Sequence, residues 1–81
     1  MQNGEALFRH ELGLRLQQAR AKARIDRGQL SLLTGFSDSE NRIAQWERGT
    51  AQIYAEELYR LAEALETTPE WLLNWDRNRR N

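Results

Sequence analysis

The sequence has no cysteine, one proline and one histidine, and none of its apolar runs is long. Without cysteine, the chain can form neither a disulfide nor a thiolate metal site; cysteine usage leaves the compartment undetermined, although the cytoplasm fits. No apolar run approaches the ~18 residues of a membrane span, and the N-terminus lacks the basic and apolar segments of a signal peptide. His10 has no acidic partner at a ligand spacing, and no nucleophile or glycine-rich phosphate motif is present. We therefore expect no metal site, no cofactor, no membrane contact and no enzymatic activity.

The charges balance, with 12 Lys and Arg against 12 Asp and Glu among 81 residues. Such a balance argues at first against a nucleic-acid partner. The charges are nevertheless sorted along the chain: residues 9–27 hold six basic and two acidic residues, 28–76 hold three basic and nine acidic ones, and 77–81 hold three arginines. Sorted charge can form a polar surface even when the sum vanishes, although a solvated helix face beside unrelated acids is the alternative.

The hydrophobic pattern is helical throughout. Apolar residues recur at steps of four and three residues over about residues 6–23, at Phe8, Leu12, Leu16, Ala19 and Ala23. Further helices are predicted over about 27–34 and 38–48, after Tyr54, and from Pro69, and no window alternates for long enough to indicate a strand. The pattern predicts an all-α fold, a compact bundle of about five short helices forming one domain over 1–76, followed by a short basic tail over 77–81.

Local residues mark the limits of the second helix. Asp26 can cap it, and Gln29 three residues later completes a capping-box pattern. Gly35 suits the left-handed residue that ends it, and Phe36 is expected to anchor the turn. Gly28 costs about 1 kcal/mol relative to alanine inside a helix, which indicates a close approach or a weakly held first turn.

The later helices have similar limits. Ser37 or Ser39 can cap the third, and Ser37 with Glu40 forms a second capping-box pattern. Thr68 and Pro69 suit the cap and the first position of the fifth. The residues expected in the core are Leu30, Leu33, Ile43, Trp46, Leu58, Leu61, Ala62, Leu65 and Trp71, whereas Glu56 and Glu57 are expected on a solvated face.

The second and third helices carry the functional pattern. Two short helices joined at a glycine turn, with small and amide side chains outside the second, describe a helix-turn-helix. That face must enter a major groove about 12 Å wide, so it needs hydrogen-bonding groups without bulk. Asn41 and Gln45 lie four residues apart there, and such amides can bond adenine at two points. Ala44 between them is small enough to approach a thymine methyl group.

Five segments of the chain occur in a familiar order. They are Leu12-Gly13-Leu14-Arg15-Leu16 with Arg20, Leu30…Thr34-Gly35, Ile43-Ala44-Gln45-Trp46-Glu47-Arg48-Gly49, Leu58…Leu61-Ala62-Glu63-Ala64-Leu65 and Pro69-Glu70-Trp71-Leu72-Leu73-Asn74. Together they resemble the Cro/repressor-type helix-turn-helix proteins, the XRE family, and the last two are similar to the end of temperate-phage repressor DNA-binding domains. The resemblance implies a lambda-repressor-like fold and a regulator of transcription, bacterial or phage, that binds a double-stranded DNA operator.

The resemblance also implies a role for individual residues. The positions at the base edges are Ser39, Glu40, Asn41, Arg42, Ala44 and Gln45. Arg27 matches a phosphate-contacting position, and Arg48, Thr50 and Gln52 are the further candidates for phosphate contact. Arg20 and Glu47 match a pair that forms a partly buried salt bridge between the first helix and the recognition helix.

The chain departs from the family pattern in three places. The segment between Gly35 and Ile43 is two residues longer than the commonest form, which leaves open which of residues 39–41 contact bases and places Asp38 and Glu40 near DNA. The loop after Gly49 lacks the usual lysine or arginine. Ile53 and Tyr54 replace a proline and a capping serine. We therefore expect modest non-specific affinity for DNA.

The expected assembly is a homodimer on a palindromic operator, with half-sites about 34 Å apart. Tyr54, Leu73 and Trp75 are the candidate dimer contacts, although Trp75 fits closure of the core equally well. One alternative is a protein-interaction module on the same fold, such as an antitoxin that neutralises a toxin, or a target of an antirepressor. Another is the N-terminal fragment of a longer repressor. The arginines of 77–81 are either solvated charge or a further contact to DNA or a partner.

Overall fold

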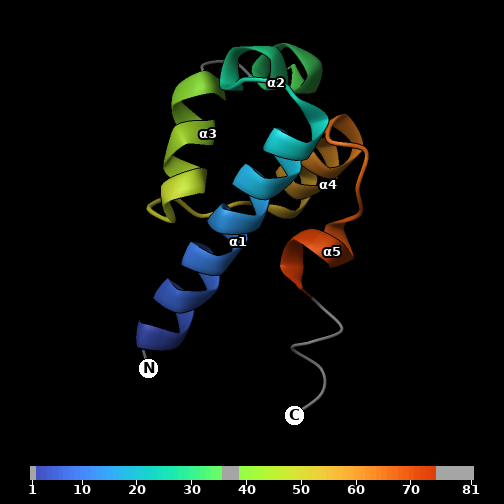
Figure 1. Ribbon diagram of the computed structural model, residues 1–81. Coiled ribbons are helices and arrows are strands. Elements are labelled where there is room, and N and C mark those ends of the chain that lie inside the picture. Colours follow the sequence, from blue (N-terminus) through green and yellow to red (C-terminus); the bar gives the residue numbers. More distant parts are fainter. Residues whose placement is uncertain (1, 36–38, 75–81) are drawn as a thin grey trace.

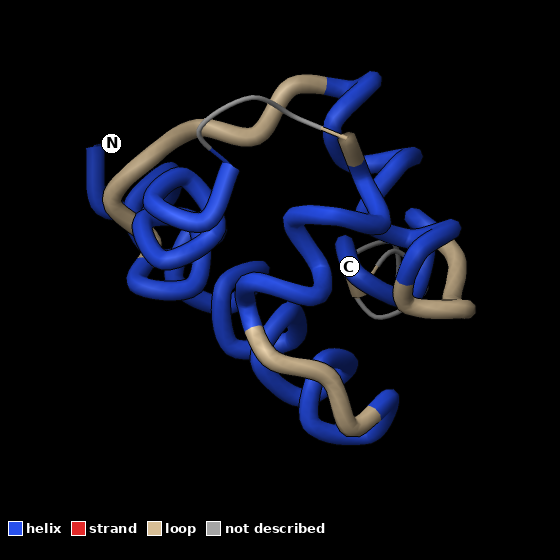
Figure 2. Tube along the Cα trace, turned by 90° about the horizontal axis from the view of Figure 1, so that it is seen from above, coloured by secondary structure: helices blue, strands red, loops and turns tan. Residues whose placement is uncertain are grey.

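The computed structural model describes residues 2–35 and 39–74, and the described part contains five α-helices. Their order is α1 (Gln2–Ala23), α2 (Arg27–Thr34), α3 (Ser39–Arg48), α4 (Ala55–Ala64) and α5 (Pro69–Leu73). Figures 1 and 2 show helices joined by short loops, with no strand in this part of the chain. The predicted all-α bundle is therefore confirmed. The predictions for Phe36, Ser37, Trp75 and the basic tail lie outside the described residues, as does the side chain of Ser39.

One core joins all five helices. The most deeply buried side chains are Leu16 of α1, Leu30 of α2, Ile43 and Trp46 of α3, Leu61 of α4 and Leu72 of α5. Because every helix contributes to the same cluster, none of them can leave it without opening an apolar cavity. The helices therefore hold their relative positions as one unit.

Helix α1 is longer than the pattern predicted, beginning at Gln2 instead of about residue 6. Leu12, Leu16 and Ala19 are buried as expected, but Phe8 and Ala23 at the two ends of the predicted stripe are exposed. In Figure 1, the N-terminal part of α1 extends beyond the end of α3. Apolar periodicity identified the helix correctly, but it could not identify where the neighbouring helices end.

Two predicted core residues lie at the surface. Leu33 follows the buried Leu30 by three residues, yet it is 61% exposed. Trp71 is 39% exposed, and its ring lies beneath the guanidinium of Arg15, with 4.1 Å between Arg15 Cζ and the ring centroid. Arg15 also donates from Nε to the Trp71 carbonyl at 2.6 Å. Trp71 therefore joins α1 to α5 through a cation–π contact at the surface, instead of packing inside the hydrophobic core.

The predicted limits of α2 and the predicted cap of α5 are confirmed. The Asp26 carboxylate accepts from the Gln29 amide, and the Gln29 side chain accepts from the Asp26 amide, both at 2.8 Å. Gly35 has φ of 73°, the left-handed conformation expected of it. The Thr68 hydroxyl accepts from the Trp71 amide at 3.1 Å.

The close backbone approach occurs at Gly13, not at Gly28. A Cβ at Gly13 would lie 2.5 Å from the Trp46 carbonyl oxygen and 2.6 Å from that of Glu47. At Gly28 the nearest atom, a carboxylate oxygen of Asp26, would lie at 3.4 Å, which is ordinary contact. Gly13 therefore allows α1 to cross the backbone of α3 at a distance that no other residue permits.

A buried carboxylate joins α3 to the two helices before it. The Glu47 side chain is 1% exposed and accepts from Arg20 Nε at 2.6 Å, Arg20 Nη2 at 3.1 Å and Arg27 Nε at 3.0 Å. Arg20 also donates to the Ile25 carbonyl, and the hydrogen bond to Glu47 is the main cause that raises the pKa of Arg20. The arrangement places Arg20 and Glu47 in the contact that the resemblance implied, and adds Arg27 of α2 to it.

Gly13→Ala is expected to destabilise the protein by about 1–3 kcal/mol, because the new methyl group meets backbone atoms that cannot rotate away. Gly28→Ala is the matched control and is expected to be neutral or to stabilise by up to about 1 kcal/mol, since its methyl group has room. Urea unfolding of both variants measures the difference. Equal stability of the two variants would contradict the close approach at Gly13.

Glu47→Gln is expected to destabilise by about 3–5 kcal/mol, because it leaves two guanidinium groups against a buried site without a counter-charge. Arg20→Ala should cost a similar amount, since it leaves Glu47 buried with only Arg27. Glu56→Gln removes a carboxylate from an exposed pair within α4 and should cost under about 0.5 kcal/mol. The comparison uses the urea midpoint of each variant, and a Glu47→Gln loss as small as that of Glu56→Gln would show that the buried pair is not what holds α3.

Candidate nucleic-acid interface

Helix α3 has one face in the core and one face in solvent. Ile43 and Trp46 are buried, whereas Asn41, Gln45 and Arg48 are exposed. At 100° per residue, these three exposed residues fall within about 60° of one another around the helix axis. In Figure 1, α3 lies at one edge of the molecule, with α1 on its inner side. The outer face of α3 is therefore exposed to solvent in the described part of the chain.

The chemistry of this face is that of two amides around a small residue. Asn41 and Gln45 lie one turn apart, and no hydrogen bond within the described residues engages either side chain. Ala44 lies beside them, half-buried. An amide offers an acceptor and two donors in one plane, which matches the paired donor and acceptor on an adenine edge. We call Asn41, Ala44 and Gln45 the base-contacting face, after the role that the family resemblance predicts for them.

A cleft lies between the N-terminal ends of α2 and α3. One part of about 340 Å³ is lined by Arg27, Glu40, Asn41 and Ala44, and an adjoining part of about 500 Å³ by Arg20, Asp26, Arg27, Gly28 and Glu40. Arg27 faces Glu47 through Nε, and its side chain is 41% exposed. Cationic side chains and the amides of a helix N-terminus suit a phosphate group, whereas the Glu40 carboxylate in the same cleft opposes one. The cleft therefore holds two arginines, Arg20 and Arg27, that favour a nucleic-acid backbone, and two carboxylates, of Asp26 and Glu40, that oppose it.

The structure does not bring Arg42 onto the base-contacting face. Arg42 lies on the flank of α3 that faces α4, where its Nη2 donates to Glu57 Oε2. Its guanidinium also lies over the ring of Trp46, with 5.3 Å between Cζ and the ring centroid. The Arg42 side chain thus has intramolecular partners, whereas the side chains of Asn41 and Gln45 have no hydrogen-bond partner among the described residues.

Glu57 is the site residue that the sequence reasoning missed. It was expected on a solvated helix face together with Glu56, but it is buried. Its Oε1 accepts from the Tyr54 amide at 2.9 Å while Oε2 accepts from Arg42. The available signal was its place three residues after Tyr54, the usual position of a glutamate that bonds back to a helix cap.

The remaining candidates for phosphate contact lie at the other end of α3. Arg48, Thr50 and Gln52 are all exposed. The Thr50 hydroxyl donates to the Gln45 carbonyl at 3.2 Å, and the Gln52 carbonyl accepts from the indole of Trp46. Arg27 therefore lies along the side of α3, near Glu40 and bonded to Glu47, whereas this group lies at the C-terminal end of the helix.

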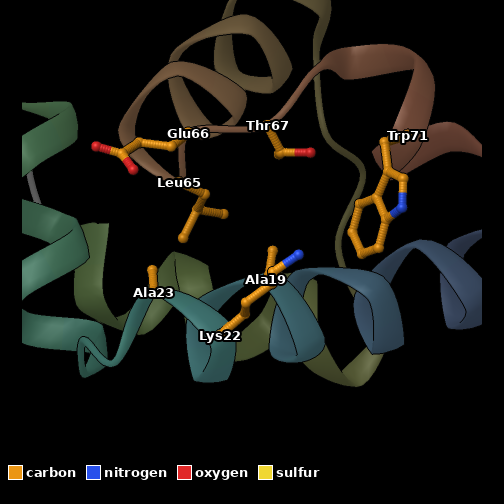
Figure 3. A pocket seen from close by; sticks show the side chains of 7 residues that line it. All are labelled: Ala19, Lys22, Ala23, Leu65, Glu66, Thr67 and Trp71. Carbon is orange, nitrogen blue, oxygen red and sulfur yellow. The ribbon is translucent and has the colours of Figure 1, made fainter.

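Of the candidate dimer contacts, Tyr54 is exposed at the start of α4, and Leu73 is partly buried against the core. A separate cleft of about 310 Å³ lies between α1 and the α4–α5 connection, away from α3 (Figure 3). Its lining is mainly apolar, with Trp71 at one end and Leu65 between the helices. Among the described residues, no group of three or more potential metal ligands occurs, and no helix is long and apolar enough to cross a membrane.

Comparisons with known proteins agree with this geometry. A family model described as a helix-turn-helix domain matches residues 13–75, which is most of the chain. No curated protein matches the sequence. Among solved structures, the crystal structure of the restriction-modification controller protein C.AhdI from Aeromonas hydrophila is similar, with a TM-score of 0.73 and 25% sequence identity over 79% of this chain and 94% of that chain. The chain belongs to the XRE-type family of helix-turn-helix DNA-binding proteins.

Proposed function

We propose that the protein is a sequence-specific transcriptional regulator that binds double-stranded DNA with α3 in the major groove. The observation that carries the proposal is the exposed amide pair of Asn41 and Gln45 on a helix that Glu47 ties to two neighbours. A helix can distinguish base pairs only if its side chains are held in a fixed register with the duplex. In this protein, the amides of Asn41 and Gln45 would contact the bases, and the Glu47 ion pairs would hold α3 in a fixed position.

The base-contacting face predicts the kind of operator. Asn41 and Gln45 each suit adenine through paired bonds to N6 and N7, and Ala44 suits contact with a thymine methyl group. Glu40 at the start of α3 could accept from the N4 amine of cytosine, and Ser39 could bond either kind of base pair. We therefore propose A·T pairs opposite the centre of α3.

Phosphate contacts would fix the register. Arg27 at the N-terminus of α2 and Arg48, Thr50 and Gln52 around the end of α3 are the proposed groups. Each phosphate that is neutralised releases counterions, so binding should weaken as salt rises. Since Glu40 is an acid in the same cleft as Arg27, affinity for random DNA should be modest.

The proposal includes action as a homodimer that represses transcription from a palindromic site, with Tyr54, Leu73 and Trp75 at the dimer contact. A single short helix reads few base pairs, and a second copy one helical turn away doubles the number read. Similarity to a restriction-modification controller protein supports a regulatory role. The alternative of a protein-binding antitoxin predicts partner binding with little salt dependence, whereas DNA binding predicts a steep one.

Gln45→Ala is expected to lose about 1–3 kcal/mol on the preferred DNA and little on random DNA, because it removes a base contact but no phosphate contact. The preferred DNA is obtained by selection from a random library with the purified protein, and affinities follow from fluorescence anisotropy. Gln18→Ala, the same change on the exposed side of α1, is the control and should bind like the unchanged protein. Equal losses of Gln45→Ala on both DNAs would refute its role at the bases.

Arg27→Gln is expected to weaken binding to preferred and random DNA alike, and to reduce the slope of log affinity against log salt by about 1. Lys22→Gln removes the same charge from the cleft of Figure 3, away from α3, and should leave the slope unchanged. A salt titration of the two variants gives both quantities. An unchanged slope for Arg27→Gln would remove Arg27 from the phosphate contacts.

A further inference from the structure

Ionic contacts hold α3 on both sides of its buried stripe. Arg42 and Glu47 lie five residues apart, which places them about 140° apart around the helix, with Ile43 and Trp46 between them. Glu47 accepts from arginines of α1 and α2, and Arg42 donates to Glu57 of α4. A rotation of α3 about its own axis would break the contacts on one flank and compress those on the other.

The contact on the α4 side is built into the start of that helix. The Glu57 side chain is 12% exposed, and its two oxygens have different partners, the Tyr54 amide and the Arg42 guanidinium. The hydrogen bond from the Tyr54 amide fixes the Glu57 carboxylate at the first turn of α4. Arg42 therefore bonds to an acceptor whose position is restrained. Trp46, which is 1% exposed, supports the guanidinium from below.

The orientation of α3 about its axis decides where Asn41 and Gln45 point. With side chains, a helix has a radius of about 5–6 Å, so a rotation of about 20° would move their tips by about 2 Å. Hydrogen bonds to base edges tolerate a donor–acceptor range of only about 0.5 Å. A small rotation is therefore enough to lose base discrimination while leaving the fold intact.

We infer that Glu57, a residue of α4 outside the base-contacting face, sets the DNA sequence preference of α3 by holding Arg42. Arg42 is on this inference a positioning residue and not a base contact, which differs from the role that the family resemblance implied for it. The inference rests on the proposed DNA-binding function. It adds a second determinant of specificity, on a different helix, to the exposed amides.

The test compares Glu57→Gln with Glu56→Gln. The two residues are neighbours on α4 and lose the same charge, but only the Glu57 carboxylate bonds Arg42; Glu56 pairs with Arg60 on the exposed side. A glutamine at 57 can still accept from the Tyr54 amide, so α4 keeps its first turn. Affinities are measured on library-selected DNA and on random DNA, well below the unfolding midpoint of each variant.

The ratio of the two affinities should fall at least fivefold for Glu57→Gln and stay within twofold for Glu56→Gln. Arg42→Gln should cause the same fall, spread over the base pairs opposite Asn41 and Gln45, and the double variant should fall no further than either single one. Arg42→Lys retains the charge and should recover part of the ratio. Unchanged ratios in Glu57→Gln and Arg42→Gln would overturn the inference.

Loss of preference at one base pair in Arg42→Gln, with full preference in Glu57→Gln, would instead make Arg42 a base contact and would also overturn the inference.

A readout without DNA separates the inference from the proposed function. The backbone amide resonances of Asn41 and Gln45 should shift in Glu57→Gln and not in Glu56→Gln, and their failure to shift would overturn the inference. If the unchanged protein selected no DNA, the proposed function would fail, while these resonances would still test the support of α3.

Discussion

The buried carboxylate of Glu47 is the contact on which the placement of α3 depends. A helix that enters a DNA groove must keep its outer face polar, so it has less apolar surface to bury than a core helix. Helix α3 buries Ile43 and Trp46 in the core, and Glu47 beside them binds Arg20 and Arg27. Removing one partner of such an ion pair leaves an uncompensated charge in a poorly solvated place, and the protein loses stability. The geometry of the contact is therefore strongly restrained. Ionic contact therefore supplies the restraint that the narrow apolar stripe cannot.

The same contacts explain why a chain without net charge can bind a polyanion. Two of the acids in the acidic part of the chain, Glu47 and Glu57, are buried against arginines and add little to the surface field. Their partners Arg20 and Arg42 are partly exposed, but each is engaged in an ion pair, whereas the Arg48 side chain is exposed. A net charge counts all these groups alike, but only exposed charges act on DNA at a distance. A net charge of zero thus argues against a surface that is basic throughout, but it is compatible with a surface that is basic in one region.

Sequence reasoning succeeded where a structure depends on neighbours along the chain. The capping box of Asp26 with Gln29 and the cap of α5 by Thr68 each join residues three positions apart, and both occur as predicted. It failed where exposure depends on distant segments: Trp71 lies at the surface against Arg15 of α1, and Glu57 is buried against Arg42, fifteen residues before it. Apolar or charged character alone cannot identify such partners. The base-contacting face was predictable as a pattern of amides, but the place of Arg42 on its flank was not.

The division of α3 into a supported side and an exposed side has a consequence for how specificity can change. The exposed side chains of Asn41 and Gln45 make no hydrogen bond or ion pair with the described part of the chain, so substitutions there should cost little stability. Glu47 and the glycine at position 13 allow almost no alternative, because a buried charge pair and a backbone crossing depend on them. On the proposed function, new operators can therefore be reached by changing Asn41 and Gln45 of the base-contacting face. Contacts such as that of Arg42 with Glu57 lie between these two classes, since they are partly exposed yet determine the direction in which the amides point.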